Sequence, residues 1–228
     1  MLQKLESLRH LLFFKLSVIY LRYLIGFAFV WASIVKIRGE RFTTISVTEP
    51  VGYFFEAMYQ TGFYWNFLGW AQFIAGALLM TQRFASFGAM VFFPIILNVC
   101  VITWSVNFGS GTPVITLLML LGTLGLLVWD YRRWVILFQY DHQIKLDLTS
   151  PPRDSLMTDP AWAISGVIFV LLILGIQLVP GASQWIGYWL ILMMLTGLVA
   201  STLAIRNFLL SKTPVEVPCD VRKGIPHR

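Results

Sequence analysis

Charged residues are scarce in this chain, and two long stretches lack them altogether. Asp, Glu, Lys and Arg make up 12% of the sequence, compared with about 25% in an ordinary soluble domain. None of them occurs between Arg83 and Asp130, or between Asp159 and Arg206. A helix needs about 20 mostly apolar residues to cross the hydrocarbon core of a bilayer, so each stretch can hold two crossings. This composition excludes a water-soluble fold and predicts a membrane protein.

Residues that bind metals or haem, or that form disulfides, are also few. The three histidines, His10, His142 and His227, lie outside the apolar stretches, so paired axial ligands for an intramembrane haem are missing. The two cysteines, Cys100 and Cys219, form no C-x-x-C pair, which argues against a thiol–disulfide enzyme. The apolar stretches carry no cluster of metal ligands, and the chain has no phosphate-binding glycine loop or nucleophile turn. We therefore expect no metal, no intrinsic cofactor and no catalytic activity of the chain on its own.

The apolar segments predict an all-α, polytopic membrane protein with six transmembrane helices. Turns rich in Gly, Pro, Ser and Asn at 107–113 and 180–184 divide the two charge-free stretches into hairpins. The expected crossings are 16–35, 62–81, 84–103, 112–129, 161–179 and 185–205. We expect the first four to form a transmembrane bundle and the last two to form an additional hairpin.

The remaining segments complete the predicted organisation. Residues 1–140 form the four-helix unit, which begins with an amphipathic helix over 1–14 that should lie on the membrane surface. Residues 141–160 are a cytoplasmic linker, 161–210 the hairpin and 211–228 a cytoplasmic tail. Between the first two crossings, the pattern of 48–65 predicts a short interfacial helix that is capped by Thr48, begins at Pro50 and lies where it would cover the bundle.

The distribution of basic residues predicts the orientation in the membrane. With both termini on one side, that side receives most of the 17 Lys and Arg residues. The other side has only Lys36, Arg38 and Arg41. By the positive-inside rule, both termini lie in the cytoplasm. The same topology explains the net charge of +6 without a nucleic acid partner.

Small and polar residues form stripes on three of the expected crossings. At 100° per residue, single helix faces carry Arg22, Gly26, Ser33 and Lys36; Gly69, Gln72, Gly76 and Arg83; and Thr112, Thr116, Thr123 and Asp130. These faces should turn inward, either for close helix packing or to form a site. Arg22 either faces a partner or cavity, or extends to the cytoplasmic surface, whereas Lys36 is expected to be an anchor. Arg83 and Asp130 lie at one level and are expected to form an ion pair.

Five polar residues are the candidate ligand contacts. They are Arg22, Glu56, Gln60, Gln72 and Asn98. Asn98 follows Pro94 by one helical turn, and that proline should kink its helix. Aromatic residues gather near the expected outer interface, where they either form an interfacial belt or line a site for a quinone; they are Tyr53, Tyr59, Phe63, Tyr64, Trp65 and Trp70.

Short motifs in the first two crossings carry a family resemblance. They are RYLIGF at 22–27, running on to Lys36, then LGWAQ at 68–72, GALL at 76–79 and RFA at 83–85. The chain resembles the DoxX family of small bacterial membrane proteins, which includes DoxD-type subunits of thiosulfate:quinone oxidoreductase. This resemblance covers residues 16–135 and implies a four-helix bundle in a bacterial inner membrane and, for some members, quinone-linked redox chemistry. Family members often have Glu where this chain has Gln72, which weakens any acid–base role carried over from the family.

Three functions compete at this point. The leading hypothesis is a non-catalytic accessory or scaffold subunit of a membrane complex, whose partner is another membrane protein or a second copy of the chain. It is motivated by the missing cofactor ligands and by small residues such as Gly197 and Ser201 on the last crossing. The alternatives are a quinone-binding component of a membrane oxidoreductase, with Arg22, Gln72 and Glu56 as polar contacts, and a carrier of a small lipid or apolar solute.

Overall fold

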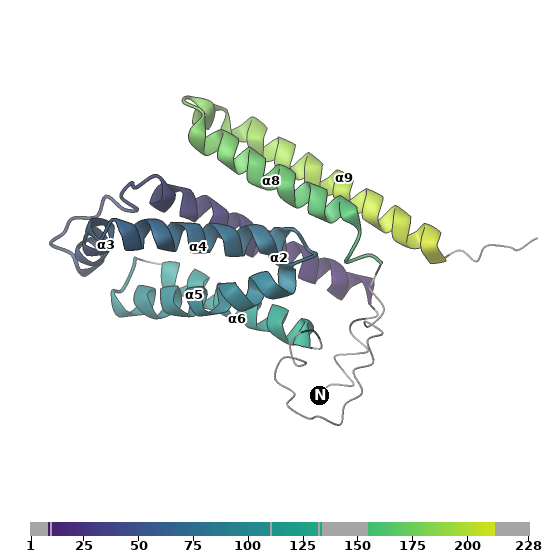
Figure 1. The fold of residues 1–228 in the computed structure, drawn as a ribbon, viewed down its shortest axis with the longest axis horizontal. Coiled ribbons are helices and arrows are strands. Elements are labelled where there is room, and N and C mark those ends of the chain that lie inside the picture. Colours follow the sequence, from purple (N-terminus) through teal and green to yellow (C-terminus); the bar gives the residue numbers. More distant parts are fainter. Residues whose placement is uncertain (1–8, 10, 110, 132, 134–154, 213–228) are drawn as a thin grey trace, which may run out of the picture.

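The computed structural model describes residues 9, 11–109, 111–131, 133 and 155–212. These residues form seven α-helices and one short 3₁₀ helix, and they contain no strand. The elements are α2 (Leu12–Ile37), α3 (Pro50–Gln60), α4 (Phe63–Met80), α5 (Ala85–Ser105), α6 (Thr112–Trp129), α8 (Pro160–Leu178), η1 (Ala182–Trp185) and α9 (Ile186–Lys212). The expected all-α fold is thus confirmed. Helices α2, α4, α5 and α6 lie side by side, and the α8–α9 hairpin packs on one flank of this group (Figure 1).

A helix is present over each of the six expected crossings and over the short segment after the first of them, with modest differences in the ends. Helix α2 is longer than predicted at both ends, and α9 continues to Lys212. The short helix after the first crossing does begin at Pro50, but its N-cap residue is Glu49, not Thr48. Of the predicted surface helix over 1–14, the structure describes residues 9 and 11–14, and residues 12–14 belong to α2. Its other residues, and most of the predicted linker and tail, lie outside the described residues.

Five helices are long and apolar enough to cross a membrane, namely α2, α5, α6, α8 and α9. They identify a membrane protein. Their outward faces carry large exposed apolar side chains, for example Leu118 on α6, Ile164 on α8 and Met194 on α9, as expected for surfaces that contact lipid. Helix α4, the second of the six expected crossings, does not reach the same apolar character, because Tyr64, Asn66 and Gln72 interrupt its 18 residues.

Helices α2 and α4 approach each other closely at glycines. A Cβ atom built on Gly26 of α2 would lie 2.7 Å from the carbonyl oxygen of Gly76, and one built on Gly76 would lie 2.9 Å from that of Gly26. Near the other end of the pair, a Cβ on Gly69 would lie 2.9 Å from the Cβ of Lys36. Two backbones can come this close only where side chains are absent. The inward stripes predicted for these two crossings therefore do meet.

The four-helix group encloses its own apolar core. This core consists of Ile25, Phe29, Ala75, Leu79, Ala89, Phe92, Ile96 and Leu126, which come from all four helices. The rings of Phe29 and Phe92 meet edge to face, with centroids 4.4 Å apart, a favoured aromatic geometry. Thr123 is fully buried beside this core, and its hydroxyl donates to the Met119 carbonyl oxygen, 2.8 Å away.

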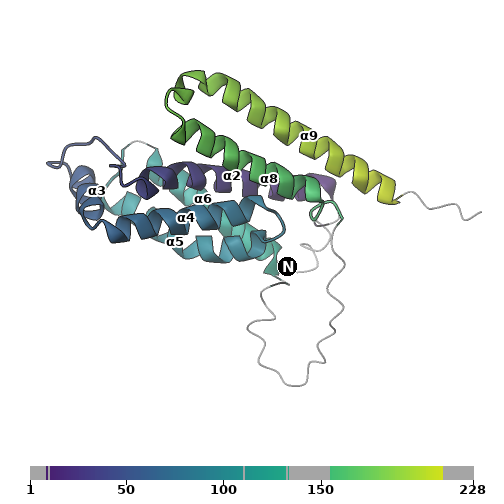
Figure 2. The ribbon, with the colours of Figure 1, turned by 45° about the horizontal axis from the view of Figure 1, so that its top comes forward.

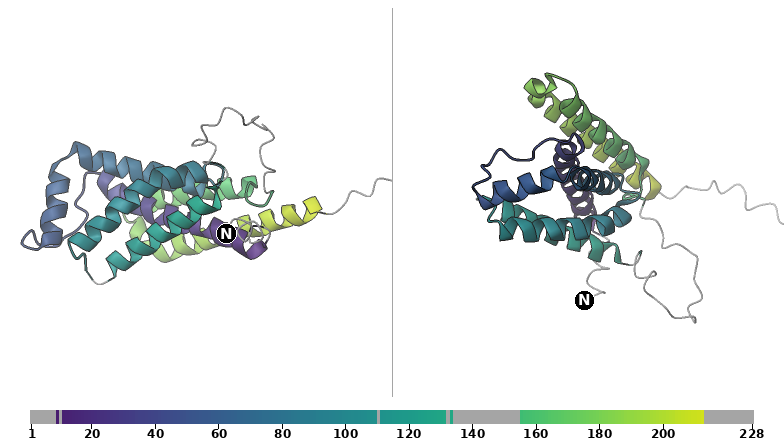
Figure 3. Two further views of the ribbon diagram at one scale, coloured as in Figure 1. Left: turned by 90° about the horizontal axis from the view of Figure 1, so that it is seen from below. Right: turned by 60° about the vertical axis from the view of Figure 1, so that its left-hand side comes forward.

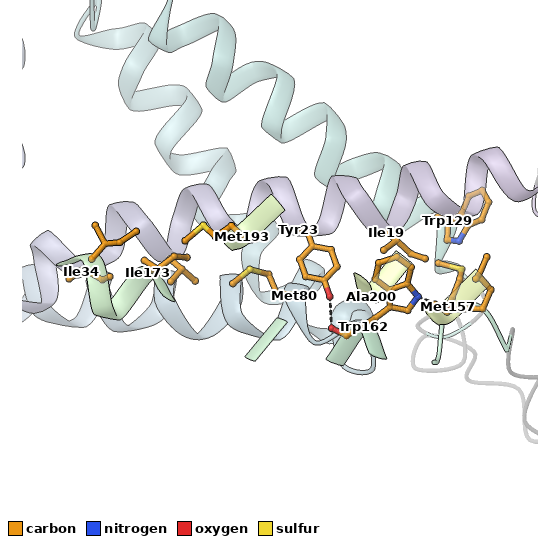
Figure 4. Packing of buried hydrophobic residues seen from close by; sticks show 14 residues of the cluster. Ile19, Tyr23, Ile34, Met80, Trp129, Met157, Trp162, Ile173, Met193 and Ala200 are labelled. Atoms are coloured by element: carbon orange, nitrogen blue, oxygen red, sulfur yellow. Dashed lines mark hydrogen bonds between the residues drawn. The ribbon is translucent and has the colours of Figure 1, made fainter. Parts of the chain in front are cut away.

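The α8–α9 hairpin packs on the flank formed by α2 and α4 (Figures 2 and 3). Gly166 of α8 leaves room for the α4 backbone, since a Cβ there would lie 2.5 Å from the Met80 carbonyl oxygen. The Tyr23 hydroxyl donates to the carbonyl oxygen of Trp162, whose ring belongs to the same apolar cluster (Figure 4). Tyr20 and Ser201 share a further hydrogen bond of 2.7 Å. The hairpin is thus joined to α2 by polar contacts as well as by apolar packing.

The glycine contact between α2 and α4 gives a first prediction. Replacing Gly76 with leucine places a side chain against the α2 backbone, which cannot move aside, so we expect unfolding to become easier by about 1–3 kcal/mol or more. Gly125 on α6 is the matched control, because a Cβ there meets nothing within 4 Å. Thermal unfolding in detergent should separate G76L from G125L. Equal midpoints for the two variants would contradict the packing described here.

Candidate functional site

A buried ion pair lies at the end of the four-helix group where α6 ends. Arg22 of α2 donates from Nη2 to Oδ2 of Asp130 at 2.6 Å, and from Nη1 to Oε1 of Gln82 at 3.0 Å. Arg22 is 1% exposed and Asp130 7%. Ser86 also donates to Asp130 Oδ2, at 2.8 Å, and Arg133 donates to the Ser86 hydroxyl at 2.9 Å. These contacts connect α2, the α4–α5 turn, α5 and the end of α6.

The α4–α5 turn is shaped to bring Gln82 into this cluster. Gln82 has a positive φ of 56°, which residues other than glycine seldom adopt. Its side chain is nevertheless buried, and it both accepts from Arg22 and donates from Nε2 to the Ile19 carbonyl oxygen at 3.4 Å. Such backbone strain persists when the surrounding contacts hold it in place.

The expected ion pair between Arg83 and Asp130 is wrong. Gln82 turns inward, and the next residue, Arg83, is exposed, with its guanidinium over the ring of Phe84. Arg22 takes the place that was predicted for Arg83. Of the two readings of Arg22, the structure supports the buried one with a partner, and the partner is Asp130. Because the carboxylate of Asp130 neutralises the guanidinium of Arg22, Arg22 is not available as the counter-ion of a ligand.

The cluster gives a second prediction. Replacing Asp130 with alanine leaves the buried Arg22 guanidinium unpaired, which should destabilise the protein by about 3–5 kcal/mol. The control is Arg83→Gln, which removes an exposed charge and should change stability by no more than about 0.5 kcal/mol. Chemical denaturation in detergent measures both. If R83Q costs as much as D130A, the assignment of the pair is refuted.

A cavity of about 560 Å³ lies at the opposite end of the four-helix group. We call it the α3 cavity, because α3 lies across this end of the bundle (Figure 3, left view) and supplies Phe54, Phe55 and Met58 to its lining. Most of the other lining residues are apolar and come from α2, α4, α5 and α6. Its volume falls within the range of about 300–1,000 Å³ that is typical of small-molecule sites. The polar lining residues are Lys36, Gln72, Asn98, Thr103, Thr112 and Thr116, with the Tyr64 hydroxyl in addition.

Lys36 brings a positive charge to the wall of this cavity. It lies in the last turn of α2 and is 4% exposed. Its ammonium group donates to the Ala32 carbonyl oxygen at 3.0 Å and lies 4.4 Å from the ring centroid of Phe42 and 5.4 Å from that of Trp65. None of the ion pairs among the described residues includes Lys36. The residue expected to be a membrane anchor is therefore a buried cation.

Two amide side chains share the cavity with Lys36. Gln72 is 3% exposed, and its Oε1 is buried without a hydrogen-bond partner. Asn98 projects from α5 into the same space, one turn beyond Pro94. Thr103 and Thr116 join their hydroxyls across α5 and α6 at 2.9 Å. A buried polar atom without a partner is costly, so the amide oxygen of Gln72 marks a place for a hydrogen-bonding group.

An ion pair fastens α3 over the cavity. Arg41, in the loop before α3, donates to both carboxylate oxygens of Glu56 at 2.7 and 3.0 Å, and Gln60 donates to the same carboxylate at 3.1 Å. The rings of Phe42 and Phe55 stack with centroids 5.3 Å apart. These hydrogen bonds lower the pKa of Glu56 to about 2. Glu56 lines a separate cavity of about 290 Å³ between α3 and the loop.

The structure thus divides the five candidate ligand contacts among three places. Gln72 and Asn98 both line the α3 cavity, Glu56 attaches α3 to Arg41 outside it with Gln60 donating to the same carboxylate, and Arg22 lies in the ion-pair cluster at the far end. Sequence reasoning missed Lys36 as a member of the site. Its position on the same helical stripe as Arg22 and Gly26 was the available signal, because the stripe faces inward along its whole length.

Attachment of α3 gives a third prediction. Because the pKa of Glu56 is lowered, its ion pair is intact at pH 5–8 and is lost as the pH falls from about 4.5 toward 2. Spin labels on Ala57 of α3 and Thr44 of the loop, in a chain whose native cysteines are replaced, should move apart over that range. In the Glu56→Gln variant the distance should no longer change with pH. An unchanged distance in the parent protein at pH 2 would contradict the proposed fastening.

No known protein family, curated protein or solved structure matches this chain. The resemblance to the DoxX family therefore stays a prediction, and the geometry described above carries the functional argument.

Proposed function

We propose that this chain is a multi-pass membrane protein that binds a lipid-soluble ligand in the α3 cavity. One observation carries the proposal: an apolar cavity within the bundle presents a buried cation, Lys36, which forms no ion pair with the described residues, and a buried amide oxygen of Gln72, which has no hydrogen-bond partner among them. A ligand with an apolar body and a polar end would complete both. Such a ligand would reach the site from the bilayer, since the lining helices themselves face lipid.

The proposal includes the predicted topology. Six crossings, with α4 as the second, place both termini in the cytoplasm of a bacterial inner membrane, and α3 and its cavity on the outer side. The concentration of Lys and Arg at the other end of the bundle supports this orientation. Helix α4 can cross although it is less apolar than the others, because α2, α5 and α8 pack around it.

A quinone is the candidate ligand that the sequence suggested. Its flat ring suits a lining that contains Phe29, Phe55 and Phe67, and its carbonyl oxygens would accept from Lys36 and from the amide of Asn98. In the earlier hypothesis Arg22 and Glu56 were polar contacts, but both are occupied elsewhere. The accessory-subunit and carrier hypotheses stay predictions, and ligand binding is compatible with each.

The proposal is tested by identifying the lipid-soluble molecules that co-purify with the protein. We expect the wild-type protein in mild detergent to carry about one lipid-soluble molecule per chain, identified by extraction and mass spectrometry. Ala71→Phe places a ring in the cavity and should reduce this occupancy at least about tenfold. Ala57→Phe is the control, because Ala57 is exposed on α3 and lies outside the lining. Equal contents in wild type and A71F would refute binding in the cavity.

A further inference from the structure

Lys36 is the single charged residue among the described residues that line the α3 cavity. Two carboxylates between α2 and the end of α3 are engaged with arginines, Glu40 of the loop with Arg38 at 2.7 Å and Glu56 of α3 with Arg41 at 2.7 Å. The third, Glu49, is exposed and does not line the cavity. The cavity therefore has an excess positive charge that the described part of the protein does not neutralise. This contrasts with the other end of the bundle, where Arg22 has Asp130.

The contacts around Lys36 offset its burial only in part. A carbonyl oxygen and two aromatic faces surround the ammonium group, and such contacts provide partial negative charge. They use one of its three donors, since the Ala32 carbonyl is its hydrogen-bond acceptor. Burying an ion becomes favourable when a counter-ion with good hydrogen-bond geometry lies beside it.

Gln72 is placed to complete the same head-group site. It lies one helical turn from Gly69, whose position is directly against the Lys36 side chain. Gln72 and Lys36 therefore line the same cavity from neighbouring stretches of α4 and α2. An amide can donate from nitrogen or accept at oxygen, so Gln72 can bind an acid group in either orientation, through its NH₂ or through an acidic O–H.

We infer that the ligand of the α3 cavity is an anionic amphiphile, a carboxylate or phosphate group on an apolar body, with Lys36 as the counter-ion of its acid group. This inference rests on the proposed function and specifies the class of ligand. The apolar body lies among the rings and aliphatic side chains of α3, α4 and α5. A charge-assisted hydrogen bond to Lys36 would then distinguish the acid from a neutral molecule of the same size.

Binding of matched ligands tests the inference. The probes are dodecanoate, dodecyl phosphate and methyl dodecanoate, which share their chain length and differ in the head group, together with a neutral short-chain quinone. Affinities are measured by competition against a radiolabelled probe at pH 7, with the protein in a neutral detergent. For the wild type, we expect at least one acid to bind about 10- to 100-fold more tightly than the ester and the quinone. The two acids show whether carboxylate or phosphate is preferred.

Variants at Lys36 separate charge from packing. Lys36→Met should abolish the preference for the acid over the ester, and a cooperative thermal unfolding transition in detergent shows that the variant is folded. Lys36→Arg should keep the preference, as should Arg83→Gln, which removes an exposed positive charge at the other end of the bundle.

Two results overturn the inference in distinguishable ways. If the ester or the quinone binds the wild type as tightly as the acids, or if K36M keeps its preference, the ligand is not held by charge, and the proposed function survives. If no probe binds the wild type and A71F changes no co-purified content, both the inference and the proposed function fail.

Discussion

The close approach of α2 to α4 is the contact on which the other features depend. Gly26 and Gly76 let the two backbones touch. Near the C-terminal end of α2, Gly69 of α4 leaves room for the Lys36 side chain. This contact fixes the rotation of α2 about its axis. As a result, Arg22 points toward Asp130 at one end and Lys36 lines the cavity at the other. A bulkier residue at the glycines would displace both cations from their surroundings.

Each end of the four-helix group contains a buried cation, but only one of the two cations has a carboxylate partner among the described residues. Arg22 is neutralised by Asp130 and receives support from Gln82, so this end is a closed polar cluster that joins four elements. Lys36 has aromatic rings and one carbonyl oxygen, but no carboxylate partner among the described residues. Buried charges that lack a partner in the protein commonly mark a site of function. The same helix therefore contributes a structural cation at one end and a functional candidate at the other.

Much of the fold could be predicted because the positions of the helices depend on composition and on the helical spacing of apolar and polar residues. The long charge-free stretches, the turns that divide them and the stripe of small residues on α2 indicated helices in nearly the right places. The Arg83–Asp130 pair shows where this reasoning stops. Arg83 and Gln82 are neighbours, and only the positive φ of Gln82 decides that the glutamine turns inward while the arginine stays exposed. Glu56 likewise looked like a ligand contact, whereas its ion pair with Arg41 depends on the path of an irregular loop.

The sequence by itself determined that this chain is an all-helical membrane protein, and which faces of α2, α4 and α6 turn inward, because hydrophobic period and the cost of burying charge act locally along the chain. Only the tertiary structure decided which polar residues meet. Asp130 is 108 residues from Arg22, and Gln72 and Asn98 line one cavity with Lys36 although they belong to three different helices. Contacts between residues so far apart in the sequence depend on how each helix is rotated about its axis and shifted along its neighbours. A local sequence pattern does not determine that rotation or shift.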